Sequence, residues 1–261
     1  MITLSSDFGS PYPAAMKGVL LQHTAARLVD VSHEFPRQDV RTAAFWLREV
    51  LPYFPPAVHL AVVDPGVGTD RGALVVRAGE HALVAPDNGL VLPVARRLAA
   101  VSDAEDATVE VFEWAYDDPA SHTFHGRDVF APCAAAVHEV GIDRLETLDA
   151  ATPADEYEDR TFPEPTLPTA EAEAPRGEVL VVDGFGNVVT NLPASVLEGH
   201  YGAHVTVHGT SGRVARAYDE VDPGTRVVTV GSHGNVELAV NRGRGDSSFG
   251  LEPGDEVRLS F

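Results

Sequence analysis

Short apolar runs of strand type alternate with longer segments of helical periodicity over residues 1–150. We predict strands in ITLSS, ARLVDVS, VHLAVVD, ALVVRA and HALVAP. We predict helices in PAAMKGVLLQHTA, in DVRTAAFWLREVLPYF with Asp39 as its N-cap, in NGLVLPVARRLAA and in RDVFAPCAAAVHEVG. Such alternation is typical of an α/β domain with a largely parallel central sheet.

The pattern changes in the second part of the chain. Residues 151–176 lack periodicity and are rich in proline and acidic residues, which predicts a linker or a surface strap. After it, GEVLVVD, AHVTVHG, RVVTVG, VELAV and DEVRLS indicate short strands separated by glycine turns, and only PASVLEG has a helical pattern. We therefore predict an N-terminal α/β domain over 1–160, a linker over 161–176 and a small β-barrel domain over 177–261.

The excess of acidic residues says more about possible partners and environment than the overall composition does. The 261 residues contain 39 Asp and Glu but 19 Lys and Arg, for a formal net charge of -20. Such a chain repels nucleic acid, so we expect no nucleic-acid partner. Lys17 is the only lysine, and acidic residues with so little lysine suggest a halophilic protein whose self-repulsion is screened by salt. A GC-rich genome, which favours arginine codons, is the alternative explanation.

The first residues and the length of the apolar runs predict the cellular location. The chain begins with a strand-like segment rather than a signal peptide, and no apolar run has the length of a membrane span. We therefore expect a cytoplasmic protein without a membrane partner. Cys133 lies in an apolar run, where a buried small side chain is a better prediction than a nucleophile.

Polar residues follow several of the predicted strands. Asp7, His33, Asp64 and the pair Asp87-Asn88 each come after an apolar run, and His125, Arg127 and Asp128 stand just before a predicted helix. In open α/β sheets ligands bind beyond the carboxyl ends of the strands. Any single Asp or His there is explained by a turn or a helix cap, but so many together predict a site.

The stretch VVDPGVGTDRGA, residues 62–73, has the glycines of a phosphate-binding loop but not its spacing. The P-loop requires a glycine, four residues and then Gly-Lys-Ser/Thr, and the dinucleotide motif requires G-x-G-x-x-G at the start of a helix. Here another strand-like run follows Gly72. Two interpretations remain: a tight turn with a surface arginine, or a loop that places Asp64 and Arg71 for chemistry.

Eight motifs occur in an order that matches a known family. They are SSDFG at 5–9, MKG at 16–18, DVSHE at 30–34, VVDPGVG at 62–68, APDNG at 85–89, TFHGRDVFAP at 123–132, DGFGNVVTN at 183–191 and GSHGNVELAVNRG at 231–243. The chain resembles the S-adenosyl-L-methionine (SAM) hydroxide adenosyltransferases, relatives of the fluorinating and chlorinating SAM halogenases. The resemblance implies a homotrimer with SAM between one subunit's N-terminal domain and the next subunit's barrel. It also implies that water or hydroxide attacks C5′ of SAM and releases adenosine and L-methionine.

The resemblance also implies roles for individual residues. Asp64, Arg71 and His125 handle the attacking water, and which of them is the base stays open. The implied substrate-binding residues are Asp7 at the ribose hydroxyls, Asp183, Asn187 and Ser232 at the methionine ammonium, Phe124, Phe185 and Tyr218 around the nucleoside, and Glu237 and Ala239 in the segment that closes on the ligand. For Phe185, burial in the barrel core is an equally good interpretation. No metal and no cofactor are implied, and the chain departs from the family pattern at Ser6 and His233.

Three other functions compete with this interpretation. A SAM halogenase would lack the Asp-Arg-His set, and Gly126 stands where the fluorinating relative has a serine that holds the halide. A metal-dependent hydrolase could use Asp7, Asp64, Asp87 and His125, although metal-binding motifs such as HExxH are missing from the sequence. A non-catalytic SAM- or adenosine-binding protein would keep the same binding residues without turnover.

Overall fold

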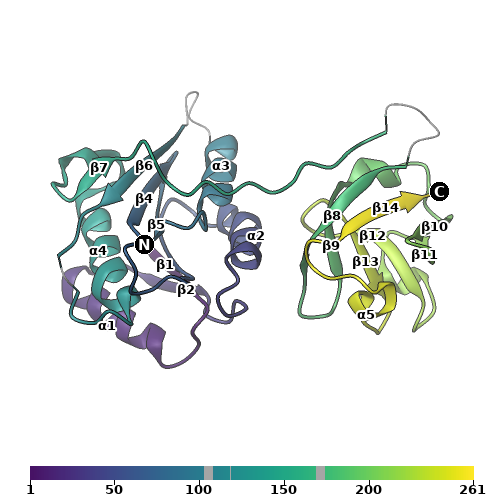
Figure 1. The fold of residues 1–261 in the computed structure, drawn as a ribbon, viewed down its shortest axis with the longest axis horizontal. Coiled ribbons are helices and arrows are strands. Elements are labelled where there is room, and N and C mark those ends of the chain that lie inside the picture. The colour runs from purple at the N-terminus through teal and green to yellow at the C-terminus, as the bar shows by residue number, and fades with distance from the viewer. Residues whose placement is uncertain (103–107, 118, 169–173) are drawn as a thin grey trace. The chain divides into compact units, whose positions relative to one another are not determined.

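The computed structural model describes residues 1–102, 108–117, 119–168 and 174–261. They form two compact units, Met1–Thr161 and Phe162–Phe261 (Figure 1). Each unit contains its own cluster of buried apolar side chains, so each is described by itself.

A seven-stranded sheet forms the centre of the first unit, as far as its residues are described. Its strands lie in the order β2-β1-β3-β5-β4-β6-β7. They are β1 (Ile2–Ser6), β2 (Leu28–Ser32), β3 (Val58–Val62), β4 (Ala73–Ala78), β5 (His81–Pro86), β6 (Val109–Trp114) and β7 (Ala151–Pro153). β2, β1, β3 and β5 pair in parallel, β4 is antiparallel to both β5 and β6, and β7 is antiparallel to β6. Five of the seven strands therefore run in one direction, and the predicted largely parallel sheet is confirmed.

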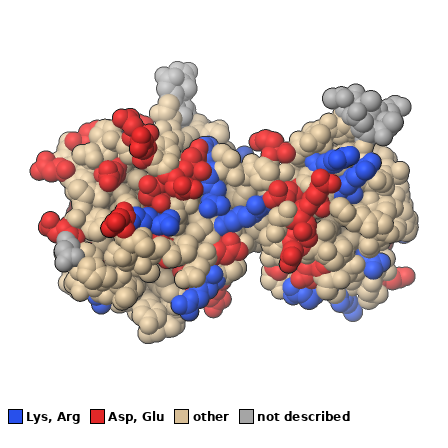
Figure 2. Space-filling view, viewed as in Figure 1, with Lys and Arg blue, Asp and Glu red and all other residues tan. Residues whose placement is uncertain are grey.

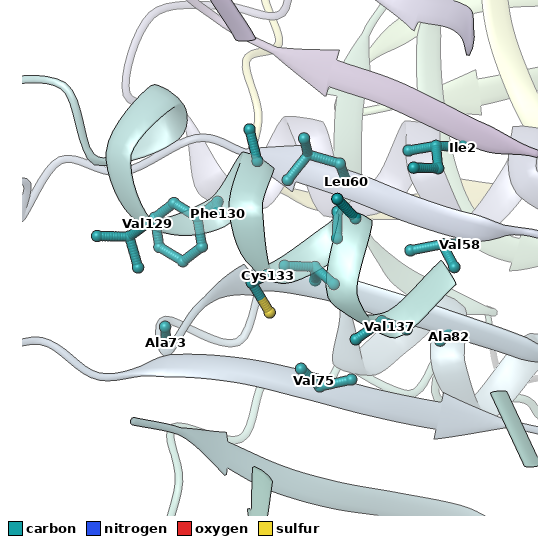
Figure 3. Close-up of a cluster of buried hydrophobic side chains, with 14 of the residues drawn as sticks. Ile2, Val58, Leu60, Ala73, Val75, Ala82, Val129, Phe130, Cys133 and Val137 are labelled. Atoms are coloured by element: carbon teal, nitrogen blue, oxygen red, sulfur yellow. The ribbon is translucent and has the colours of Figure 1, made fainter. Parts of the chain in front are cut away.

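Helices cover both faces of this sheet. They are α1 (Tyr12–His23), α2 (Val40–Val50), α3 (Leu92–Val101) and α4 (Ala131–Val140), with the short turns η1 (Leu51–Tyr53), η2 (Gly126–Phe130) and η3 (Ile142–Thr147). α1 packs against α4 on one face, and α2 packs against α3 on the other (Figure 1). Figure 3 shows Cys133 and Val137 of α4 beside Val58, Val75 and Ala82 of the sheet. Cys133 is fully buried, as predicted.

Individual side chains near two helix starts explain where and how these helices begin. The Asp39 side chain accepts a hydrogen bond of 2.9 Å from the Thr42 N–H, which confirms it as the N-cap of α2. The helix predicted over RDVFAPCAAAVHEVG begins instead as the wider π-helical turn η2 and continues as α4. Pro132, which has no N–H to donate, stands at the junction. Single π-turns of this kind are frequent at functional sites.

Two strands of this sheet were not predicted from the sequence. β6 exposes Glu110 and Glu113 near the edge of the sheet, so its charged side chains mask a short apolar pattern. β7 comprises only Ala151–Pro153 and lies in the segment predicted to be a linker or strap. The prediction is wrong for these three residues because their strand character comes from pairing with β6, a long-range contact.

The second unit is a closed barrel. Among the described residues, its strands follow one another as β10-β11-β12-β13-β9-β8-β14. They are β8 (Arg176–Val182), β9 (Val188–Pro193), β10 (His204–Val207), β11 (Thr210–Val214), β12 (Arg226–Val230), β13 (Asn235–Val240) and β14 (Glu256–Ser260), with η4 (Ala194–Leu197), η5 (Tyr218–Glu220) and α5 (Gly245–Phe249) between them. The predicted barrel is therefore confirmed. Closure of the barrel removes the exposed edges that an open sheet would have.

The details of the barrel differ from the expectation. β9 and β11 were missed, and β11 contains Gly212, whose missing side chain makes room for Val228 and Phe249. PASVLEG forms only the short turn η4, and the helix α5 was not expected. These segments take their structure from pairing and packing in the folded chain.

The described parts of the proline-rich segment are hydrogen-bonded within the unit to which each belongs. On the first unit, the Arg96 Nη1 donates to the Arg160 carbonyl at 2.9 Å. On the second, Thr166 and Arg176 exchange two backbone hydrogen bonds of 2.8 and 2.9 Å, and Asn191 Nδ2 donates to the Pro163 carbonyl at 2.7 Å. The carbonyls of Arg160 and Pro163 are thus held by side chains of their own unit, and Thr166 is held by the backbone of Arg176.

Acidic side chains are spread over the viewed face of both units, as Figure 2 shows. Lys17, the single lysine, pairs with Asp30 at 2.5 Å. In the part of the chain that the structure describes, no helix has the length and apolar character needed to cross a bilayer.

Candidate active site

A cavity of about 570 Å³ opens at the carboxyl ends of β1 and β3. These two strands are neighbours and parallel, so the residues that follow them meet at one edge of the sheet. Asp7 and Asp64 thereby line the same cavity. A smaller space of about 80 Å³ beside it is lined by both carboxylates and by His125.

Asp64 is held at the floor of this cavity. Its side chain is only 6% exposed, its Oδ1 accepts a hydrogen bond of 2.9 Å from the Gly66 N–H, and the same oxygen lies 3.4 Å from Arg71 Nε. Burial raises the pKa of the Asp64 carboxyl, and the Gly66 N–H and the charges of Arg71 and His125 oppose that rise. Burial is the largest of these effects, so Asp64 binds a proton more readily than an exposed aspartate.

Arg71 reaches Asp64 across the glycine loop. A Cβ at Gly66 would lie 2.6 Å from Arg71 Nε and Nη2, so a glycine at this position makes room for the guanidinium. Arg71 Nη1 donates to the Asp87 carbonyl at 3.2 Å. The 3.4 Å contact with Asp64 is an ion pair but not a hydrogen bond, and Arg71 Nε is buried without a hydrogen-bond partner. The loop 62–73 thus forms a turn that brings Arg71 into contact with Asp64, and Arg71 is partly buried rather than a free surface arginine.

His125 completes the group. It is 6% exposed and its Nε2 is buried without a hydrogen-bond partner. It stands at the start of η2, yet its side chain makes no capping hydrogen bond there. The alternative that His125 merely bonds the start of a helix is therefore wrong. The ring of Tyr116 packs edge-on against it with centroids 6.2 Å apart.

Asp7 lies at the other side of the cavity with three aromatic rings. Its Oδ2 accepts a hydrogen bond of 2.5 Å from the Gln38 N–H. Phe124 packs edge-on against Phe8 at 5.9 Å and against Tyr12 at 5.4 Å between ring centroids. Phe8, Tyr12 and Gln38 line the cavity but were missed by the sequence analysis, although Phe8 and Tyr12 flank the predicted Asp7 closely.

Several of the other polar residues at strand ends serve the scaffold. His33 is hydrogen-bonded to Ser6 Oγ at 2.7 Å and lies 3.0 Å from Asp30. Asn88 is buried and donates to the Val63 carbonyl at 2.8 Å. Asp87 accepts a hydrogen bond from the Glu158 N–H. Arg127 forms an ion pair with Asp128 and also lines the cavity.

In the barrel, Asp183 organises the turn between β8 and β9. Its Oδ1 accepts hydrogen bonds of 2.8 Å from the Phe185 and Asn187 N–H groups, and its Oδ2 accepts one of 3.0 Å from Asn187 Nδ2. Phe185 projects from this turn with 80% of its surface exposed. The alternative that Phe185 belongs to the barrel core is therefore wrong.

A second polar group of the barrel surrounds Glu237, which is 5% exposed. The Tyr218 hydroxyl donates to its Oε1 at 2.5 Å, and His233 Nε2 lies 3.6 Å from its Oε2. Two more predicted residues lie nearby in the sequence: Ser232 is exposed, and the Ala239 side chain is buried against Ala215, Val221 and Val227.

Asp64, Arg71 and His125 of the first unit form a group that can act on a water molecule. Among the described residues, no three His, Cys, Asp or Glu side chains gather in a way that could hold a metal ion. Asp64 and His125 line the smaller space, the Arg71 guanidinium contacts Asp64, and Arg71 Nε and His125 Nε2 are buried without hydrogen-bond partners. Such a set can orient a water molecule and accept its proton.

Comparisons with known proteins agree with this arrangement. The family model of the SAM hydroxide adenosyltransferase N-terminal domain matches residues 2–147, and that of the C-terminal domain matches residues 177–258. The chain is 40% identical over 262 residues to the (R)-S-adenosyl-L-methionine hydrolase of Salinispora tropica, covering 99% of this chain and 97% of the relative. It is 42% identical over 264 residues to the enzyme of the same name from Thermus thermophilus, covering 97% of each.

Solved structures show the same likeness in three dimensions. A conserved uncharacterized protein from Thermotoga maritima superposes with a TM-score of 0.83 at 32% identity over the full length of both chains. A conserved hypothetical protein from Thermus thermophilus superposes with a TM-score of 0.75 at 38% identity over 99% of each. This chain therefore belongs to the SAM hydroxide adenosyltransferase family.

Proposed function

We propose that this protein hydrolyses (R)-S-adenosyl-L-methionine to adenosine and L-methionine. Water attacks C5′, the bond from C5′ to sulfur breaks, the sulfonium leaves as the neutral thioether of methionine, and the proton of the water passes to the enzyme. The observation that carries the proposal is the contact of Asp64 with Arg71 beside His125 at the floor of the cavity. The names of the curated relatives support the same substrate.

The leaving group requires no acid, because the sulfur gains an electron pair and loses its charge. Catalysis therefore consists of aligning water opposite the sulfur and removing its proton. We assign Asp64 as the proton acceptor, because burial raises the pKa of its carboxyl and no hydrogen bond to its Oδ2 is present among the described residues. Arg71 and His125 have buried N–H or ring nitrogen atoms that can hold the water in line.

Substrate contacts are proposed on both units. Asp7 accepts hydrogen bonds from the two ribose hydroxyls, and Phe124 borders the nucleoside from the aromatic wall of the cavity. On the barrel the proposed contacts are Asp183, Asn187 and Ser232 at the methionine end, Phe185 and Tyr218 at the nucleoside, and Glu237 and Ala239 in the closing segment. The exposure of Phe185 on its turn supports a role for that ring in contact with a ligand.

The assembly belongs to the proposal as well. We retain the division into 1–160, 161–176 and 177–261, and a homotrimer in which one subunit's first domain and the next subunit's barrel share a SAM molecule. Sedimentation of the full chain tests this: a trimer is expected, and a monomer with full turnover would contradict it. The protein acts without a metal or another cofactor, so excess chelator leaves its activity unchanged.

The proposed setting is a cytoplasm of high salt. The formal charge of -20 and the single lysine support it, because bound and free counter-ions relieve repulsion among the acidic side chains. The free energy of unfolding, measured in low and in molar potassium chloride, is expected to be larger in molar salt. Equal stability at both concentrations would overturn the halophilic assignment.

One incubation tests the activity. The purified chain is mixed with SAM in buffer without halide and with chelator, and the products are separated by chromatography. Adenosine and methionine in equal amounts are expected. A 5′-halo-adenosine that forms only when chloride or fluoride is added would indicate a halogenase, and SAM binding without any product would indicate a binding protein.

A further inference from the structure

The barrel contains a buried carboxylate whose polar neighbours are a tyrosine and a histidine. Glu237 lies in the middle of β13 with 6% of its side chain exposed. The Tyr218 hydroxyl donates to its Oε1, and His233 Nε2 faces its Oε2. Among the residues that the structure describes, no arginine or lysine forms an ion pair with Glu237. A buried carboxylate without a cation is costly, which points to a role beyond packing.

The tautomer of His233 follows from its other nitrogen. The Asn235 N–H donates to His233 Nδ1 at 3.3 Å, so Nδ1 is an acceptor and carries no proton. The ring proton is then on Nε2, the atom that lies 3.6 Å from Glu237 Oε2. That distance exceeds a hydrogen bond, but contacts of this kind often shorten when a ligand binds.

The turn between β12 and β13 keeps the imidazole in this position. A Cβ at Gly231 would lie 2.4 Å from His233 Nε2 and 2.8 Å from Glu237 Oε2. The backbone of Gly231 therefore packs directly against the contact between these two side chains. The Gly234 N–H donates to the Gly231 carbonyl at 2.9 Å, which makes the turn tight. The histidine is therefore held against the carboxylate by the turn that carries it.

The group lies beside open space. Tyr218 is 43% exposed and borders a surface cavity of about 450 Å³. Burial raises the pKa of the Tyr218 hydroxyl, as do its hydrogen bond to Glu237 and the nearby charge of Asp183, so the hydroxyl remains a donor. The Tyr218 hydroxyl occupies one of the roughly four acceptor positions of the Glu237 carboxylate and His233 Nε2 faces another, which leaves acceptor capacity for a ligand.

We propose that His233 is a positioning residue for the substrate: its Nε2–H and the Tyr218 hydroxyl hold the Glu237 carboxylate in place for an N–H donor of the substrate. The proposal rests on the proposed hydrolysis of SAM and assigns a role to the position at which the sequence departs from its family. His233 acts through Glu237 and touches no reacting atom. Its loss should weaken binding while the chemical step remains.

The test compares two substitutions of similar size in the full-length chain. His233→Gln keeps an N–H donor at the distance of Nε2, whereas His233→Asn keeps an amide near Nδ1 but loses that donor. His204→Asn, an exposed histidine on β10, is the matched control. Each variant is assayed for kcat and KM with SAM, for Kd with S-adenosyl-L-homocysteine by calorimetry, and for its thermal unfolding midpoint.

We expect His233→Asn to raise KM and Kd about tenfold, which corresponds to about 1.4 kcal/mol, with kcat within about threefold of wild type. His233→Gln should restore most of the affinity, and His204→Asn should resemble wild type. In a Glu237→Gln background, His233→Asn should add nothing further, because residues that act through one another are not additive.

Three results would overturn the proposal: unchanged KM and Kd in His233→Asn, effects that add fully in the double variant, or an equal loss in both His233 variants together with a lower unfolding midpoint. The last would mean that the histidine only stabilises the barrel. Absence of adenosine from the wild-type protein would instead overturn the proposed function, and the calorimetric Kd values would still test His233.

Discussion

The two units present their carboxylates in different states. In the first unit Asp64 receives one backbone hydrogen bond and one long ion pair, and the neighbouring Arg71 Nε and His125 Nε2 are buried without hydrogen-bond partners. In the barrel Asp183 receives three hydrogen bonds from its own turn. A group that is under-bonded can exchange a proton or take a reactant, whereas a carboxylate held by three hydrogen bonds is a rigid acceptor.

This difference suggests a division of labour. The first unit provides the carboxylate whose pKa is displaced, because the Asp64 side chain is buried. The barrel provides acceptors whose geometry is set before a ligand arrives. We therefore expect substitutions in the Asp64 group to change turnover and substitutions in the barrel to change affinity, and five predictions test that expectation.

The largest effect is expected for Asp64→Asn. Removing the proton acceptor should lower kcat by about 10²- to 10⁴-fold, the usual contribution of a general base, with little change in KM. In the wild type, kcat should rise with pH as Asp64 loses its proton, and burial places that rise above the ordinary aspartate pKa of 3.8. A pH–rate profile measures it, and an Asp64→Asn variant with normal kcat would refute the assignment.

Arg71→Ala should follow in size. Loss of a charged partner costs about 1.5–3 kcal/mol, or about 10- to 100-fold in kcat. Arg71 lowers the Asp64 pKa, so its removal should move the rise of kcat to higher pH, and alkaline buffer should restore part of the rate. A variant that binds SAM poorly but keeps its kcat would show that the loop holds the ligand instead.

Asp7→Ala tests the one carboxylate of the first unit that we assign to binding. Because its ribose contacts persist in the transition state, KM should rise at least about tenfold while kcat falls much less. Steady-state kinetics with SAM measure the split. A large loss of kcat at unchanged affinity would place Asp7 with Asp64 and would weaken the division between the units.

Asp183→Asn makes the matching test in the barrel. The amide oxygen can still accept from the turn N–H groups, so the fold should persist, but the negative charge at the proposed ammonium site is lost. We expect KM to rise about five- to tenfold with nearly normal kcat. Calorimetry with S-adenosyl-L-homocysteine provides the affinity, and a kcat defect as large as that of Arg71→Ala would break the comparison.

The smallest effect is expected for Gly66→Ala. Its Cβ would lie 2.6 Å from the Arg71 guanidinium, which must shift away from Asp64. We expect kcat to fall about three- to tenfold, less than in Arg71→Ala, because the charge remains close by. Gly18→Ala in α1, where a Cβ meets no atom within 4 Å, is the control and should retain wild-type kcat.

Much of the fold could be predicted because many of its elements have clear periodicity. α2 with its Asp39 cap, the strands β1, β3, β4 and β5, and the change to short strands after Arg176 all follow from local patterns. β7, β9, β11 and α5 could not be predicted in this way. Length is not the reason, since β1, β3, β4 and β5 also have six residues or fewer. The missed segments take their structure from pairing and packing in the folded chain.

The candidate site divides along the same line. The resemblance carried by the order of the motifs predicted Asp64, Arg71 and His125 as one set. The sequence did not indicate the aromatic wall of Phe8 and Tyr12, the Gln38 N–H that holds Asp7, or the pairing of His233 with Glu237. These contacts join side chains through turns whose shape no residue pattern specifies.

The sequence by itself determined the class of each unit, the acidic balance and the residue types at the strand ends, because these depend on local patterning and composition. Only the tertiary structure decided which of those residues keep unmet hydrogen bonds and a displaced pKa. His33 and Asn88 became scaffold because partners satisfied them, while Asp64 was buried beside Arg71 and His125 with its pKa raised. Desolvation and unmet hydrogen bonds belong to the packed chain, and they separate a structural carboxylate from a catalytic one.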